Sequence, residues 1–160
     1  MKTNLVRVLA LSAIAAVAGS AQQVDTAQAN AHRGGGVAPI VGVWDVAVTV
    51  VNCQTSAVIR NVQSVQMYQP DGTFSETTSL GSRGSSIGYW YQEEAQIYGA
   101  AYFFFRYNPD LSFASFAKAT NKITVSADGS QFSVAATIQD YDANNNLLST
   151  DCVTQTAKRL

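Results

Sequence analysis

The chain has 160 residues, of which 13% are charged, and a formal net charge of -1 at pH 7. A weakly acidic chain with so few charges has no electrostatic basis for binding nucleic acid or an anionic membrane surface. Its length fits one domain with a single hydrophobic core, once an N-terminal export signal is set aside.

Residues 1–21 have the three parts of a secretory signal peptide. Lys2 and Arg7 supply positive charge, an apolar run of small and branched residues follows, and small residues mark a cleavage site. We expect cleavage after Ala21, with Ala29 as the second choice. The apolar run is shorter than the ~20 residues needed to span a bilayer, so a membrane anchor is not expected. These features predict an exported protein, either periplasmic or secreted.

Residues 22–39 are rich in alanine, glutamine and glycine, which predicts a flexible leader before a folded domain at 40–160. The chain's one histidine, His32, lies in this leader. A lone histidine in a flexible segment has no partners for catalysis or metal binding, so we expect neither role for it.

From Ile40 onward the sequence has strand periodicity and no convincing helical period. Clear turn signals stand at Pro70-Asp71-Gly72, Asn108-Pro109-Asp110 and Asp128-Gly129. The expected strands span about 41–53, 57–69, 73–80, 87–94, 97–107, 111–119, 122–127, 131–141 and 147–158. Short strands with hairpin-sized links are typical of a sandwich or a barrel, and links between nearest neighbours favour the barrel. We therefore predict an all-β fold, an antiparallel up-and-down (meander) barrel of about eight strands.

The two cysteines, Cys53 and Cys152, lie near the first and last expected strands. Trp44 and the valines that alternate after it form the inner face of the first strand, which leaves Cys53 on the outer face. Cys152 belongs to a row of threonines that we also expect outside. Matching parity permits a cross-strand bridge, and export places the thiols in an oxidising compartment. A disulfide is therefore predicted, because two thiols without a histidine partner make a poor zinc site.

Gly42-Val43-Trp44 opens the first expected strand and resembles the Gly-x-Trp signature of the lipocalins and their calycin relatives. That resemblance implies that Arg159, at the end of the last strand, packs over Trp44 and closes the barrel together with Gly42. The wider pattern is similar to exported bacterial lipocalin-like barrels of uncharacterised function, over the segments Trp44–Cys53, Gly72–Phe74, Gly88–Trp90, Phe103–Asp110, Asp128-Gly129 and Tyr141–Cys152. The chain is shorter than typical lipocalins and shows no C-terminal helix. The resemblance therefore implies the barrel and an apolar ligand, but no particular ligand.

No catalytic residue is predicted. The expected domain contains no histidine, so Ser-His and Cys-His devices are absent. Glu93 and Glu94 are adjacent in a strand and point to opposite faces, so they cannot act as a carboxylate pair. Asp140 and Asp142 are expected to serve the turn at 142–146. Nothing in the sequence requires a metal or a cofactor.

The aromatic run from Ile97 to Tyr107 is the best indication of function, because both of its faces are apolar. In one interpretation the odd-numbered residues fill the core and the even-numbered ones pack under a loop or the leader. In the other, the surplus aromatic face forms a ligand mouth or an oligomer surface. Arg106 and Arg60 are expected to orient a carboxylate there. The candidate ligand-binding residues are Trp90, Tyr89, Tyr91, Tyr102, Phe103, Phe104, Phe105, Arg106 and Arg60.

Three functions are compatible with this sequence. The first is a non-enzymatic exported barrel that binds a small apolar or amphipathic molecule, which a lumen fully filled by side chains would argue against. The second is a protein-binding module such as a secreted-protease inhibitor, with a partner or a second copy bound through the aromatic surface. The third is a cyclase or isomerase of the allene-oxide-cyclase or dirigent type, which needs a buried acid or tyrosine hydroxyl in the lumen.

Overall fold

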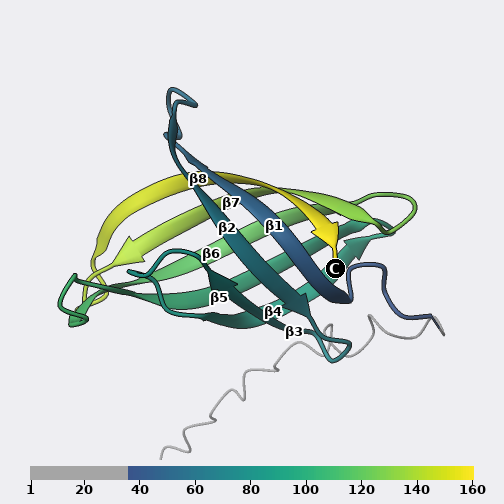
Figure 1. The fold of residues 1–160 in the computed structure, drawn as a ribbon, viewed down its shortest axis with the longest axis horizontal. Coiled ribbons are helices and arrows are strands. Elements are labelled where there is room, and N and C mark those ends of the chain that lie inside the picture. Colours follow the sequence, from purple (N-terminus) through teal and green to yellow (C-terminus); the bar gives the residue numbers. More distant parts are fainter. Residues whose placement is uncertain (1–35) are drawn as a thin grey trace, which may run out of the picture.

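The computed structural model describes residues 36–160, which form a closed antiparallel barrel (Figure 1). Each strand pairs with its neighbours in the chain, and the last strand pairs with the first. The strands are β1 (Gly42–Val51), β2 (Val58–Tyr68), β3 (Thr73–Thr78), β4 (Ser86–Glu94), β5 (Ile97–Tyr107), β6 (Phe113–Val125), β7 (Gln131–Tyr141) and β8 (Leu147–Arg159). The predicted meander barrel of eight strands is confirmed.

Alternation along each strand separates the lumen from the outside, as β1 shows. Trp44, Val46 and Val48 are buried, while Asp45 and Ala47 between them are exposed. Because successive side chains point to opposite faces of a strand, this pattern fixes which residues fill the barrel.

The barrel has a closed end, where β1 begins and β8 ends. The indole nitrogen of Trp44 donates a hydrogen bond of 2.8 Å to the carbonyl of Ile40, and the guanidinium carbon of Arg159 lies 4.3 Å from the Trp44 ring centre. Arg159 also donates to the carbonyls of Val41 and Gly129, at 2.8 and 3.0 Å. Both described chain ends lie here, and the loops after β5 and β7 lie at the other end (Figure 1).

Two boundaries differ from the sequence-based expectation. The expected strands at 111–119 and 122–127 are one continuous strand, β6, because Thr120 and Asn121 continue the in-out alternation without a turn. Ala38, expected in the leader, packs against the core, and the carbonyl of Pro39 accepts a hydrogen bond from Arg159. The expected signal peptide and most of the leader lie outside the described residues.

The predicted disulfide is confirmed. Cys53 and Cys152 are bonded with their Cα atoms 5.1 Å apart, and they are 99 residues apart in the chain. Cys152 is the partner of Val51 in the β1–β8 ladder, so the bridge fastens this seam at the end opposite Arg159. In the described part of the chain, no helix is long and apolar enough to cross a membrane.

Candidate functional site

Aromatic rings fill the half of the lumen nearest the closed end. The ring centres of Trp44 and Phe132 are 4.7 Å apart, and those of Tyr68 and Phe74 are 5.0 Å apart. Phe74 also contacts Tyr102 at 4.7 Å. Each of these side chains is 5% exposed or less. Rings in mutual contact leave no space for a ligand in this half of the barrel.

A buried carboxylate, Glu76 of β3, lies in the middle of the lumen. It accepts hydrogen bonds from the hydroxyls of Ser64 and Ser86, at 2.8 and 2.9 Å, and from the amide of Gln66, at 3.0 Å. It also forms an ion pair with Arg83, and the side chains of Arg83 and Glu76 are 8% and 1% exposed. A charge removed from water in this way is tolerated only because it is paired and hydrogen-bonded.

The polar network continues across the lumen to the opposite strands. Gln66 donates to the side chain of Gln155 on β8 at 3.0 Å, and the hydroxyl of Tyr68 donates to Gln66 at 2.8 Å. Burial raises the pKa of Tyr68 well above its usual value, and nearby Tyr102 and Glu76 add to the rise. Burial, followed by the charge of Glu76, raises the pKa of Tyr102 as well. Both tyrosines therefore stay neutral in the folded barrel, and Tyr68 acts as a hydrogen-bond donor to Gln66.

Above this network lies the open end of the barrel, here called the mouth. Its residues surround a cavity of about 20 Å³ and are Val48, Val50, Arg60, Val62, Leu80, Arg83, Phe104, Arg106 and Ile138. Arg83 comes from the loop at 79–85, and its guanidinium carbon lies 3.7 Å from the centre of the Phe104 ring. Arg106 lies 5.1 Å from the same ring and pairs with Asp140, with one of its nitrogens 3.0 Å from a carboxylate oxygen.

The mouth carries more positive than negative charge. It contains three guanidinium groups but only two carboxylates: Glu76 forms an ion pair with Arg83, and Asp140 forms one with Arg106. Arg60, among residues 36–160, forms no ion pair or hydrogen bond through its side chain. The Nε atom of Arg83 is buried and also lacks a hydrogen-bond partner. Unused guanidinium donors beside an apolar wall form a site suited to an anionic group.

The outside of the barrel presents two further features, of which the first is aromatic. We define the aromatic patch as the exposed outer residues of β4, β5 and the start of β6, namely Ile87, Tyr89, Tyr91, Phe103, Phe105 and Phe113. The rings of Phe103 and Phe105 are 4.9 Å apart, and those of Phe105 and Phe113 are 6.1 Å apart.

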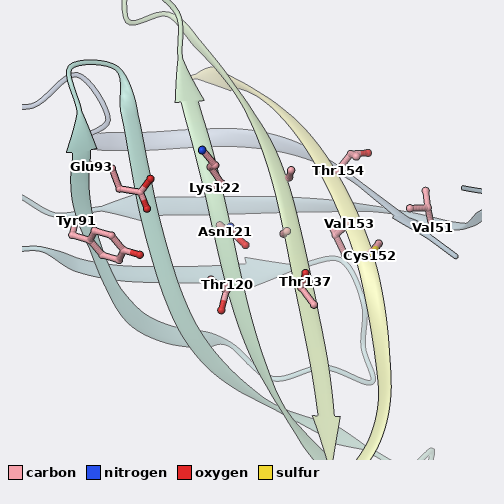
Figure 2. A pocket seen from close by; sticks show the side chains of 12 residues that line it. Val51, Tyr91, Glu93, Thr120, Asn121, Lys122, Thr137, Cys152, Val153 and Thr154 are labelled. Carbon is pink, nitrogen blue, oxygen red and sulfur yellow. The ribbon is translucent and has the colours of Figure 1, made fainter. Parts of the chain in front are cut away.

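The second outer feature is a shallow groove of about 490 Å³ (Figure 2). Tyr91 and Glu93 stand on one side of it, and Cys152 and Thr154 of β8 stand on the other (Figure 2). Burial against its surroundings, followed by nearby Glu93, raises the pKa of Tyr91. The groove is larger than the cavity at the mouth, but its floor is mostly threonine and alanine. Ligand specificity rests on convergent polar groups more than on volume, so the mouth is the stronger candidate site.

The predicted ligand-binding residues do not form one wall, because alternation divides them. Arg60, Phe104 and Arg106 meet at the mouth, as the carboxylate hypothesis requires. The others are separated: Tyr102 lies in the lumen and Trp90 near its closed end, whereas Tyr89, Tyr91, Phe103 and Phe105 are outside.

Two sequence-based expectations about these strands are wrong. The even-numbered residues of β5, not the odd-numbered ones, fill the core: Phe104 is 1% exposed, and Phe105 is 43% exposed. Asp140 does not serve the turn at 142–146, because it faces the mouth and pairs with Arg106. Asp142 holds that turn, where hydrogen bonds from the side chain and backbone of Asn146 lower its pKa.

The sequence reasoning missed Glu76 and Arg83. A signal for Glu76 was present, since it shares the parity of buried Phe74 on a strand with strict alternation. No signal existed for Arg83, because its position depends on how the loop at 79–85 folds over the mouth. Within residues 36–160, no group of three or more histidine, cysteine or acidic side chains is placed to hold a metal ion.

The fold of this chain is similar to that of solved β-barrels. No model of a known protein family matches the chain, and no curated protein matches it. Among solved structures it is similar to EF1p2_mFAP2b bound to DFHBI, with a TM-score of 0.54 and 19% identity over 76% of this chain and 94% of that one. It is also similar to mFAP1, a redesigned beta barrel bound to DFHBI, with a TM-score of 0.50 and 19% identity over 78% of this chain and 100% of that one. At such identity the likeness shows a shared fold, the closed β-barrel.

Proposed function

We propose that this protein is an exported, non-enzymatic barrel that binds a small amphipathic molecule by its anionic group at the mouth. The observation that carries the proposal is the convergence of Arg60, Arg83 and Arg106 on one cavity with an apolar wall. Two of these arginines have partners inside the barrel, and the side chain of Arg60 has none in the described structure.

The anionic group would bind the arginine donors that the protein leaves unused. Arg60 is exposed, so it can turn toward a ligand without breaking an existing contact. The free Nε of Arg83 lies deeper, beside the Phe104 ring. A guanidinium binds a carboxylate through two parallel hydrogen bonds, which makes arginine better suited than lysine to this recognition.

The apolar part of the ligand would stay near the rim. The cavity of about 20 Å³ is close to the space of one water molecule, and packed rings close the lumen below. The rim offers exposed apolar side chains from separate strands, including Val58, which is 61% exposed, and Leu147, which is 53% exposed. The ligand is therefore expected to be small and held by its head group.

Other observations support parts of this proposal. The structurally similar barrels were solved with DFHBI bound, which supports small-molecule binding as a use of this fold. The disulfide agrees with an oxidising compartment and hence with export.

The cyclase or isomerase alternative needs a buried acid or tyrosine hydroxyl in the lumen, and the lumen contains a buried glutamate and buried tyrosines. However, the carboxylate of Glu76 already accepts hydrogen bonds from three uncharged side chains and forms an ion pair with Arg83. A general base needs an oxygen within reach of the substrate's proton, so this arrangement favours a structural role.

Calorimetry of the disulfide-bonded protein with dodecanoate, and with uncharged dodecanol as the matched ligand, tests the proposal. Arg60→Met is expected to weaken dodecanoate binding about 10-fold to 100-fold, because a hydrogen bond to a charged group contributes about 1.5–3 kcal/mol. Dodecanol binding should be unaffected. Lys122→Met, on the outer groove, is the charge-matched control and should bind like the wild type. Equal dodecanoate affinity in Arg60→Met and the wild type, or no binding by the wild type, would refute the proposal.

A further inference from the structure

The aromatic patch is a feature of the outer surface that the proposed function leaves unused. Ile87 is 69% exposed, Tyr89 48%, Phe103 37%, Phe105 43% and Phe113 44%. Elsewhere the outer face of the barrel is mixed: β8 presents threonines, while β1 and β2 present Val43, Val65 and Met67, which are 38%, 40% and 39% exposed but include no aromatic ring. Scattered exposed apolar residues are normal in soluble proteins, but a contiguous aromatic surface of this kind usually marks a contact.

Neighbouring rings hold the patch in place. Phe103 is the ladder partner of Ile87 on β4, and its ring lies 5.3 Å from that of Phe116 on β6. Phe116 in turn stacks on Tyr141 of β7, with ring centres 5.5 Å apart and planes 14° apart. Side chains fixed in this way lose little conformational entropy when a partner covers them.

We propose that the aromatic patch is the interface with a second copy of this chain. None of the residues that define the patch is charged, and Lys118, the ladder partner of Phe103, has its ammonium 4.4 Å from the Tyr141 ring centre. An anionic lipid surface or a nucleic acid requires basic residues beside the rings, and a charged protein partner requires a complementary charge. A second copy brings the same neutral aromatic face, so a twofold axis through the patch pairs rings with rings.

The size of the patch agrees with a dimer. An aromatic side chain buries about 200 Å² when it is fully covered, so the exposed fractions of the patch residues correspond to roughly 500 Å² on each copy. Two copies would bury about 1,000 Å² from these residues alone, which is near the lower limit for a specific interface. The closed barrel has no free strand edge, so the copies must meet face to face rather than by extending the sheet.

Sedimentation velocity of the disulfide-bonded protein over a range of micromolar concentrations tests this inference. The wild type is expected to show a dimer that dissociates on dilution. Ile87→Glu and Phe105→Glu should each raise the dissociation constant at least 30-fold, because they bury a carboxylate in a neutral interface. Ile87 is 69% exposed and lies on the outer face, so its variant should fold like the wild type. Thr154→Glu, on an exposed position of β8, is the matched control and should dimerise normally.

The other outcomes overturn the inference. A wild type that is monomeric throughout the range excludes a functional dimer. A dimer that persists in both patch variants places the interface elsewhere. A monomer that floats with phosphatidylcholine vesicles identifies a lipid surface as the occupant. None of these results depends on Arg60, so the inference and the proposed ligand site can fail separately.

Discussion

The buried charge of Glu76, in the middle of the lumen, should contribute strongly to the stability of the fold. Replacing Glu76 with glutamine keeps the size and shape of the side chain but removes its negative charge. Arg83 would then lie 8% exposed, without its ion-pair partner, above a lumen that cannot admit bulk water. The new amide would also direct a donor toward the hydroxyls of Ser64 and Ser86 or the amide of Gln66, which now donate to the carboxylate.

The magnitude follows from the burial of the pair. Removing one partner of a buried ion pair costs about 3–5 kcal/mol, because the other charge is left uncompensated. Arg83 keeps its contact with the Phe104 ring, so we expect a loss near the lower limit, about 3 kcal/mol. The second change, Arg83→Met, removes the uncompensated charge and should restore much of that loss. Arg83→Met alone also leaves a buried charge, Glu76, without its partner, so the coupling energy between the two positions is expected to be at least about 2 kcal/mol.

Urea unfolding of the wild type, both single variants and the double variant measures this coupling in one cycle. The change in midpoint converts to free energy of unfolding if the slope with urea is the same for all four proteins. The reasoning is wrong if Glu76→Gln costs less than about 1 kcal/mol, or if the double variant is less stable than either single variant. Either result would mean that water reaches Arg83 in the folded protein.

Three other perturbations have defined outcomes. The double variant Cys53→Ala and Cys152→Ala should lose about 4 kcal/mol in urea unfolding, because the bridge closes a loop of 99 residues in the unfolded chain. Gly42→Ala should cost about 1–3 kcal/mol, since φ is +142° there and an added Cβ would displace the guanidinium end of Arg159; an unchanged thermal midpoint would contradict this. At Asp128, hydrogen bonds from neighbouring serine hydroxyls lower the folded-state pKa to about 2, below the unfolded value of 3.8. Its stabilisation is present above pH 3.8 and is lost as the pH falls toward 2, so thermal midpoints of the wild type and Asp128→Asn should converge over that interval.

The fold was predictable because alternation is a local property. Trp44 and the following valines identify the lumen face of β1, and the same parity places Cys53 and Cys152 on the outer face, where they are bonded. The run from Ile97 to Tyr107 was harder, since both of its faces are aromatic. Only the register with its neighbours, which the sequence does not record, shows that the even-numbered face is inside.

The candidate site was predictable only in part. Arg60 and Arg106 were expected to share a ligand mouth, and they do line one cavity. Their surroundings were not predicted, because Arg83 reaches the lumen from a loop whose path depends on tertiary contacts. Asp140 was assigned to a turn from its proximity in the sequence, whereas its partner Arg106 is 34 residues away. Long-range ion pairs of this kind leave no local pattern to detect.

The seam between β1 and β8 is fastened covalently near the mouth and by Arg159 at the closed end. Transient opening of the barrel must therefore begin elsewhere, and β3 is the shortest strand, with 6 residues where the others have 9 to 13. Its amide protons should exchange with deuterium faster than those of any other strand. Since β3 carries Glu76, each opening would release the anchor of Arg83 and the loop above it. Solvent would then reach the lumen through the wall of the barrel at β3, away from the β1–β8 seam that the disulfide holds closed.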